Sequence, residues 1–184
     1  GVGGQGIGVA EAAFQHSTDY ALSRKQGKAT IANGSGTIID HADIRRMLIS
    51  MRADIFASRA LELENAKAID MASATGDLEW VNRAAFLTPI TKVFGTEVGI
   101  NISHLGVQIH GGMGFIEETG AAQFSRDVRV TAIYEGTNGI QAMDLVGRKM
   151  MDNGEAAYAI INEIKEYINN LSLIHISEPT RRRG

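Results

Sequence analysis

Proline is nearly absent from this chain, and that absence limits what the chain can fold into. Residues 1–88 and 90–178 contain no proline, so long helices can form there without a lost backbone donor or a clashing ring. Apolar residues recur at the helical period over 6–24, 41–75, 78–109 and 139–150, with a short helical piece over 117–126 and a resumed pattern after 154. Three long helices, a shorter fourth and no strand signal predict an all-α fold, an up-and-down four-helix bundle.

The same periodicity predicts which side chains face the core of the bundle. They are Val9, Ala13, Phe14, Ala21 and Leu22 in the first helix; Ile44, Leu48, Met51, Ile55, Leu61 or Glu62, Ala66 and Ile69 in the second; and Val81, Ala85, Ile90, Phe94, Val98, Leu105 and Ile109 in the third. Asp40 or His41 is the expected cap of the second helix. That helix should stop near Thr75 and Gly76, because glycine is a natural helix terminator.

Composition excludes several functional classes. The formal net charge of −3 argues against a nucleic-acid binder, which needs a clustered basic face. No uninterrupted apolar run approaches the roughly 20 residues of a membrane span. The sequence has no cysteine, so it offers neither a disulfide framework nor thiolate chemistry, which fits a reducing compartment. With 184 residues the chain has the length of one domain.

Both ends of the sequence depart from the pattern of the rest. Residue 1 is Gly rather than Met, and an amphipathic pattern starts without a preceding turn, so we expect a chain truncated inside an element. After Leu171, "SLIHISEPTRRRG" lacks helical periodicity and finishes in a run of arginines. The expected organisation is one helical domain over 1–171 and a tail over 172–184 that is non-native or disordered, with a native basic tail as the alternative.

Two motifs lead to negative predictions. The N-terminal "GVGGQG" has the G-x-G-x-x-G form of a dinucleotide fingerprint, but no strand precedes it. Because that fingerprint works only in a strand-turn-helix unit, the favoured interpretation is a set of small residues that lets helices pack closely. The five histidines show no metal-like pairing; His104 and His110 are six apart, whereas a helical metal pair is spaced i, i+4. No metal site is predicted.

Two polar segments end the first and third helices. Arg24 in "ALSRKQGK" either complements the helix dipole or clamps a phosphate. In "QIHGGMGF", Gln108 and the glycines after it place an amide and unhindered backbone N–H groups at a helix end. A ligand can approach such a main chain closely, and a plain C-cap turn is the alternative.

Glu135 is the candidate for chemistry. It lies in "IYEGTNGIQ", just before an expected helix N-terminus that Thr137 or Asn138 could cap and that suits an anion. The preceding Ile133 and Tyr134, with Ala132, would form an apolar wall that makes a carboxylate a better general base. The alternative is a solvated loop residue.

Three segments carry a resemblance to a known family. "AEAAFQHSTDYALSRKQGK", "FLTPITKVFGTEVG" and "VQIHGGMGFIEETGAAQFSRDVRVTAIYEGTNGIQAMDLVGRKM" together resemble the acyl-CoA dehydrogenases. The resemblance covers about residues 1–171 and is closest to the longer bacterial type, because helical sequence continues past "GRKM". It implies the C-terminal helical bundle of a flavoenzyme, and therefore a fragment that lacks the family's N-terminal helical domain and middle β-domain.

The resemblance implies roles for the residues around Glu135. In the family, the glutamate of the Tyr-Glu-Gly-Thr motif takes the α-proton of an acyl-CoA thioester while a hydride passes from the β-carbon to N5 of FAD, giving a trans-2-enoyl-CoA. Glu135 matches this base, and its N–H would help to polarise the thioester carbonyl. Gly136 matches a substrate-contacting position, and Tyr134 should line the same pocket. Thr137 and Asn138 match flavin-contacting positions.

A second set of residues is implied to bind FAD elsewhere. The loop that holds the adenosine end of the cofactor is matched by Gln108, Ile109, His110, Gly111 and Gly112. Arg24 matches the arginine that binds the pyrophosphate, with Gln26 as its neighbour. In the family these elements reach the FAD of an adjacent subunit, which implies a homodimer or homotetramer.

The resemblance also implies partners and a compartment. The substrate would be an acyl-CoA, the electron acceptor an electron-transfer flavoprotein, and the location the bacterial cytoplasm or, alternatively, the mitochondrial matrix. The chain by itself is expected to be inactive. A rival hypothesis from another class is a non-catalytic helical assembly module that kept the packing of the family.

Overall fold

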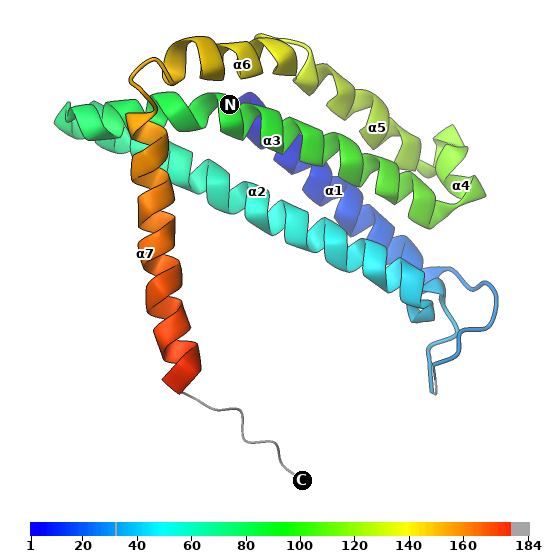
Figure 1. The fold of residues 1–184 in the computed structure, drawn as a ribbon. Coiled ribbons are helices and arrows are strands. Elements are labelled where there is room, and N and C mark those ends of the chain that lie inside the picture. The colour runs from blue at the N-terminus through cyan, green and yellow to red at the C-terminus, as the bar shows by residue number, and fades with distance from the viewer. Residues whose placement is uncertain (32, 178–184) are drawn as a thin grey trace.

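The structure is a computed structural model that describes residues 1–31 and 33–177. The described residues form helices and loops without strands, so the all-α prediction is confirmed. Three long helices, α1 (Val2–Ser23), α2 (Ala42–Thr75) and α3 (Leu78–His110), run side by side (Figure 1). The shorter elements that follow are α4 (Gly112–Phe115), α5 (Ala121–Arg129), α6 (Asn138–Asp144) and α7 (Glu155–Ser177).

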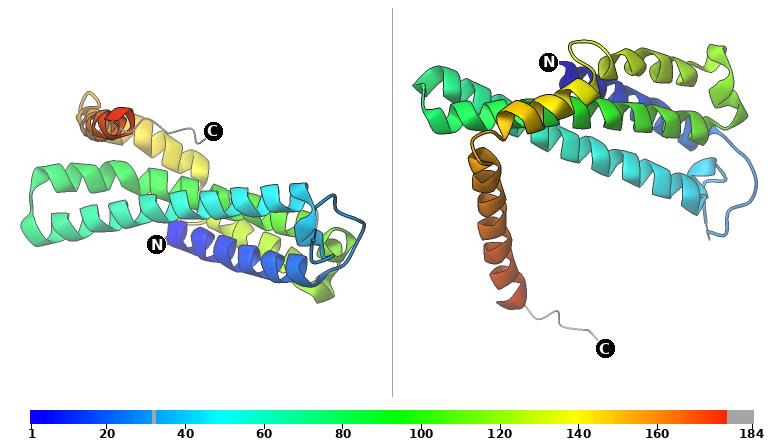
Figure 2. Two further views of the ribbon diagram at one scale, coloured as in Figure 1. Left: turned by 90° about the horizontal axis from the view of Figure 1, so that it is seen from below. Right: turned by 45° about the horizontal axis from the view of Figure 1, so that its top comes forward.

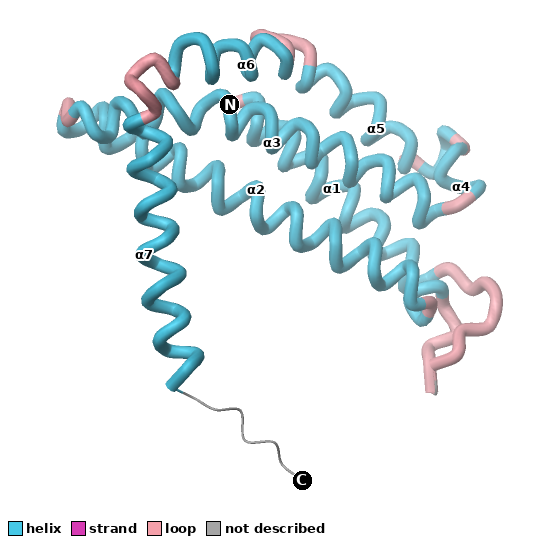
Figure 3. The backbone as a smooth tube through the Cα atoms, in the orientation of Figure 1, coloured by secondary structure: helices cyan, strands magenta, loops and turns pink. Residues whose placement is uncertain are grey.

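The fourth position of the bundle is filled by two helices instead of one. A 3-10 turn (Val130–Ala132) follows α5, a loop leads on to α6, and both helices pack along α3. A π-helical turn (Leu145–Lys149) continues α6. Figure 3 shows the break between α5 and α6 as a short loop near the middle of the molecule, and the long loop between α1 and α2 at one end. The predicted four-helix bundle therefore has a broken fourth helix, and the break carries Glu135.

α7 projects away from the bundle in Figure 1 and in the right-hand view of Figure 2. An ion pair of 2.6 Å between Arg83 of α3 and Glu163 ties it to the bundle. The helix continues through residues 172–177, although the sequence there lacks helical periodicity. No glycine or proline stands between Leu171 and Pro179 to stop the helix earlier. The predicted tail beyond Ser177 lies outside the described residues.

Small residues, rather than large apolar ones, set the contact between α1 and α3. A Cβ atom added at Gly6 would lie 2.5 Å from the carbonyl oxygen of Gly95, so the two backbones touch. The interpretation of "GVGGQG" as a packing motif is confirmed, and α1 starts at Val2 rather than near Gly6. The facing side of α3 buries small polar residues such as Thr91 and Ser103, whose hydroxyls donate to the carbonyls one turn earlier.

Several predicted core residues are exposed. Phe94 of α3 is 40% exposed, because Thr91 and Gly95 occupy the buried face beside α1 instead. Val81 is also 40% exposed and lies near the start of α3, where Ala84 and Leu87 are the buried residues. In α2 the predicted stripe holds as far as Ile55, after which the buried positions are Ser58, Asn65 and Ala68. The remaining predicted residues that are exposed are Leu22, Ala66 and Ile69.

The ends of α2 agree only in part with the caps predicted for them. His41 occupies the N-cap position, but its side chain makes no cap hydrogen bond. Asp40 accepts from the backbone N–H of Gly36 (2.7 Å) and so stabilises the preceding loop. The C-terminus is as predicted, with Gly76 in the left-handed conformation (φ 73°). None of the helices within the described part of the chain has the length and hydrophobicity needed to cross a lipid bilayer.

Candidate active site

Glu135 is held in a backbone conformation that glutamate rarely adopts. Its φ is 51°, and that of the adjacent Gly136 is 84°. Among the described residues, the other non-glycines with positive φ are Asn33 and Asn153, and asparagine tolerates this conformation. A left-handed glutamate costs about 1–2 kcal/mol relative to the right-handed region. Strain of this kind persists where the surroundings impose it and is concentrated at functional sites.

Hydrogen bonds to the next helix hold this turn. Gln141 Nε2 donates to the backbone oxygen of Glu135 (3.2 Å). Thr137 is the N-cap of α6, and its hydroxyl accepts from the N–H of Ile140 (3.3 Å). The prediction of a capped helix directly after Glu135 is therefore confirmed, with Thr137 as the cap.

The apolar wall predicted around Glu135 is not built by the residues that precede it. Ala132 is buried below the turn, but Ile133 is 51% exposed. The Tyr134 hydroxyl donates to Gln5 Oε1 on α1, so its ring is tied to the first helix. The Glu135 side chain is exposed.

Asn138 joins α6 to α3. Its Oδ1 accepts from Lys92 Nζ (2.7 Å), and its Nδ2 donates to Glu97 Oε1 (2.7 Å) and to Thr96 Oγ1 (3.1 Å). The Asn138 amide is thus occupied by partners within the chain, and it fixes the start of α6 against the middle of α3. The Glu135 turn is held between this attachment and α5.

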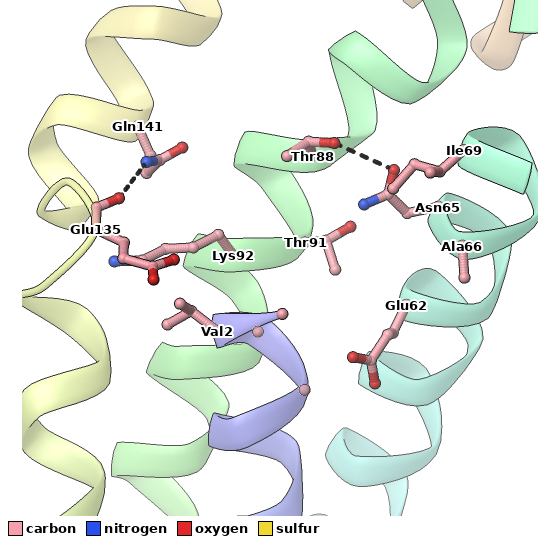
Figure 4. A pocket seen from close by; sticks show the side chains of 13 residues that line it. Val2, Glu62, Asn65, Ala66, Ile69, Thr88, Thr91, Lys92, Glu135 and Gln141 are labelled. Atoms are coloured by element: carbon pink, nitrogen blue, oxygen red, sulfur yellow. Dashed lines mark hydrogen bonds between the residues drawn. The ribbon is translucent and has the colours of Figure 1, made fainter. Parts of the chain in front are cut away.

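A pocket of about 310 Å³ opens beside the Glu135 turn (Figure 4). The N-terminus of α1, the facing sides of α2 and α3, and the turn itself line it. Its polar side chains include Glu62, Asn65, Lys92 and Glu135. Sequence reasoning missed Lys92; the available signal was a lysine inside the otherwise apolar "FLTPITKVFG".

Lys92 is buried, which is unusual for this residue type. Burial lowers the pKa of its ammonium group, and the negative charges of Glu97 and Glu135 raise that pKa in opposition. The pocket therefore brings together an exposed carboxylate and a buried cation.

A second pocket, of about 730 Å³, lies at the opposite end of α1. Six of the residues predicted to bind FAD line it, namely Arg24, Gln26, Ile109, His110, Gly111 and Gly112. Gln108 does not line it; its side chain is exposed and its carbonyl accepts from the N–H of Gly111. Tyr20 and His41 also line this pocket and were missed, although Tyr20 lies one helical turn before Arg24.

His110 gives the second pocket an unused hydrogen-bonding atom. Its Nδ1 lies 2.7 Å from the carbonyl oxygen of Gly106 and so donates to it. Its Nε2 is buried and has no hydrogen-bond partner in the described part of the chain. The ring is stacked between His16 (4.8 Å) and Tyr20 (4.2 Å), and burial lowers its pKa, so the imidazole favours the neutral form. A neutral Nε2 is an acceptor.

The glycines after His110 leave space for a ligand. Gly111 has φ 60°, and no atom lies within 4 Å of a Cβ added at Gly111 or Gly112. Arg24 is exposed and donates to Gln26 Oε1 (3.1 Å) at the same pocket. Within residues 1–31 and 33–177, no group of three histidine or acidic side chains is arranged to hold a metal ion.

The described residues form a helical domain with two pockets, one beside a strained carboxylate and one beside an arginine and a glycine-rich helix end. Residues 1–151 match the sequence model of the acyl-CoA dehydrogenase C-terminal domain. The chain belongs to the acyl-CoA dehydrogenase family, as its resemblance implied.

Named relatives agree with this assignment. The chain is 48% identical over 158 residues to 3-methylmercaptopropionyl-CoA dehydrogenase of Ruegeria pomeroyi. The aligned residues cover 83% of this chain and 27% of the relative. The chain is 34% identical to a butyryl-CoA dehydrogenase of Syntrophomonas wolfei, over 89% of this chain and 28% of the relative. The chain thus spans little more than a quarter of the length of these relatives.

Solved structures share the fold. Butyryl-CoA dehydrogenase from Megasphaera elsdenii superposes with a TM-score of 0.64 at 29% identity, over 79% of this chain and 34% of that one. ACDH-11 of Caenorhabditis elegans, solved in complex with C11-CoA, gives a TM-score of 0.78 at 21% identity, over 92% of this chain and 27% of that one. The second likeness concerns the fold alone.

Proposed function

We propose that this chain is the helical domain of an FAD-dependent acyl-CoA dehydrogenase and that Glu135 is its catalytic base. The observation that carries the proposal is the left-handed backbone of Glu135 (φ 51°) beside an open pocket. A turn of this shape favours glycine, so a glutamate there fits a group kept for its chemistry. The domain would cover residues 1–171 of a longer protein.

The proposed reaction removes two hydrogens from neighbouring carbons of an acyl-CoA. The Glu135 carboxylate takes the α-proton, and the electron pair of that C–H bond forms the new double bond as a hydride leaves the β-carbon. FAD, when bound, would accept that hydride. The N–H of Glu135, which has no partner among the described residues, would donate to the thioester oxygen and acidify the α-carbon. Tyr134 and Gly136 would contact the acyl group.

The residues of the second pocket fit the adenosine half of FAD. The orphaned Nε2 of His110 can accept from a hydroxyl or amino group, and Gly111 and Gly112 leave room for close approach. Arg24 and Gln26 offer a cation and an amide suited to a pyrophosphate. Ile109 adds an apolar wall. Gln108 would reach the cofactor through its exposed side chain, because its backbone carbonyl already accepts from Gly111.

Near Glu135, Thr137 and Asn138 would contact the flavin through their backbones. The Thr137 hydroxyl already caps α6, and the Asn138 amide is already bound to α3. Their side chains are thus used within the chain, and their backbone groups remain for the flavin.

The distance between the two pockets supports a site shared between subunits. They lie at opposite ends of α1, whose 22 residues span roughly 33 Å. The Arg24 and Glu135 groups would then serve different FAD molecules in a homodimer or homotetramer. The expected electron acceptor is an electron-transfer flavoprotein, and the expected compartment is the bacterial cytoplasm.

The test uses the complete protein that contains this chain. With 3-methylmercaptopropionyl-CoA and butyryl-CoA as first substrates, acyl-CoA should bleach the flavin of the wild type. Glu135→Gln should retain FAD and abolish bleaching, while Glu118→Gln, on an exposed turn far from the pocket, should bleach normally. Normal bleaching by Glu135→Gln would overturn the proposed base. A complete protein that binds no flavin would favour a non-catalytic assembly module.

A further inference from the structure

Lys92 is buried without an ion pair. It is 8% exposed, yet no carboxylate oxygen among the described residues lies within 4.0 Å of its ammonium group. Its one hydrogen bond goes to the neutral Oδ1 of Asn138 (2.7 Å). Burying a charge is expensive unless it is paired, so an unpaired ammonium in this bundle needs a reason.

A purely structural role, as a brace that holds α6 against α3, does not explain the buried charge of Lys92. The Asn138 Oδ1 that Lys92 contacts also accepts from the Thr96 hydroxyl (3.3 Å), and the Asn138 amide donates to Glu97 (2.7 Å). α6 is therefore attached to α3 even without the lysine. A neutral donor at position 92 could make the same bond without the penalty of a buried charge.

The charge of Lys92 acts on Glu135. In Figure 4 the Lys92 side chain extends from α3 toward the Glu135 carboxylate, and both line the same pocket. The negative charge of Glu135 raises the pKa of Lys92 against the lowering by burial. The ammonium and the carboxylate therefore attract each other across the pocket.

The other charged groups near Lys92 are accounted for. Glu97 lies one turn further along α3 and also raises the pKa of Lys92, but its Oε1 accepts from Asn138. Glu62 of α2 and the terminal residue Gly1 of α1 also line the pocket. Glu135 is thus the carboxylate in this pocket that both faces the ammonium and lies on the strained turn.

We infer that Lys92 is a positioning residue for the base. Its ammonium group, held by Asn138, places a positive charge in the pocket beside the Glu135 carboxylate. The inference rests on the proposed function, because it assigns Lys92 a role in proton abstraction by Glu135.

The first test is the rate of flavin reduction by acyl-CoA in the complete protein. Lys92→Met should slow this step, because the carboxylate loses its neighbouring cation. KM should change little, and Lys92→Arg should restore the rate because it keeps the charge. Lys165→Met, on the exposed face of α7, is the matched control and should behave as the wild type. Normal flavin reduction by Lys92→Met, or a Lys92→Arg variant as slow as Lys92→Met, would overturn the inference.

The second test substitutes Glu135 and measures the titration of the unchanged Lys92. NMR titration of the Lys92 side chain in this chain should show its proton lost at lower pH in Glu135→Gln than in wild type, and Glu118→Gln should have no effect. An unchanged titration in Glu135→Gln would overturn the inference. The outcomes separate the two proposals: active Glu135→Gln contradicts the proposed base, whereas an inactive Glu135→Gln with an unaltered Lys92 titration contradicts only the role of Lys92.

Discussion

The carbonyl oxygen of Gly3 on α1 lies 2.7 Å from the place where a Cβ atom of Gly95 on α3 would be. The same spacing recurs one turn along, where a Cβ at Gly99 would lie 2.7 Å from the carbonyl oxygen of Gly6. The two backbones are therefore in direct contact over two turns. Because the first residues of α1 also line the Glu135 pocket, this contact determines where one wall of the candidate active site stands.

Gly95→Ala should destabilise the chain. The added methyl group meets main-chain atoms of α1 that cannot rotate away, so we expect a loss of about 1–3 kcal/mol in the free energy of unfolding. Gly8→Ala is the matched control, because Gly8 is an exposed glycine of α1 with no atom within 4 Å of its added Cβ. It should raise the free energy of unfolding by roughly 0.5–1 kcal/mol through helix propensity. Urea denaturation measures both, and equal effects of the two variants would contradict the close contact.

Glu135→Gly should separate stability from activity. Glycine adopts a φ of 51° without strain, so the free energy of unfolding should rise by roughly 1 kcal/mol relative to Glu135→Ala, which keeps a Cβ. Both variants should lose acyl-CoA-dependent flavin reduction in the complete protein. Thermal unfolding compares their stabilities.

Gly136→Ala tests the adjoining position in the opposite direction. The φ of Gly136 is 84°, and its added Cβ would lie 2.9 Å from Gln141 Nε2, the group that donates to Glu135. This variant should be less stable than the wild type by about 1 kcal/mol or more. A Gly136→Ala protein as stable as wild type would contradict the conformation described for the turn.

The sequence was a good guide where a residue type allows few conformations or where one motif carries the chemistry. Gly76 correctly predicted the end of α2, and Thr137 correctly predicted the start of α6. Arg24 and His110, which were predicted to bind the same cofactor, line one pocket. Large apolar residues misled, as Phe94 shows, because the tight contact between α1 and α3 buries small and hydroxyl residues instead. Lys92 was missed because its partner Asn138 lies 46 residues further along the chain, and periodicity carries no such long-range information.

His110 should make the fold sensitive to mild acid. Its pKa is lowered in the folded chain by burial, so below its ordinary value of about 6.5 the unfolded chain binds the proton more readily. The free energy of unfolding should therefore fall as the pH is lowered from 7 to 5. His110→Phe, which keeps an aromatic ring between His16 and Tyr20, should weaken this dependence, whereas His104→Phe on an exposed face of α3 should not. Urea titrations across that pH range provide the measurement, and an unchanged slope in His110→Phe would assign the acid sensitivity to other groups.

The attachment of α7 to the bundle should be lost in stronger acid. Arg83 donates to Glu163 of α7 (2.6 Å) and to Glu64 of α2 (2.7 Å), and the bond from Arg83 lowers the pKa of Glu163. A carboxyl with a lowered folded pKa stabilises the folded state above its ordinary value of about 4.3, and that contribution disappears as the pH falls through the lowered value. Because Glu163 is largely exposed, solvent screening keeps the contribution below about 1 kcal/mol.

Trp80 can report this release, since it is the single tryptophan of the chain and the Arg83 guanidinium lies 6.0 Å from its ring. Trp80 fluorescence should change as the pH falls below about 4, before the bundle itself unfolds. Glu163→Gln should remove that early change because the amide cannot titrate, and Glu166→Gln, on an exposed position of the same helix, should retain it. If Glu163→Gln keeps the early change, Arg83 is responding to Glu64 instead, and α7 is held to the bundle by apolar contacts rather than by this ion pair.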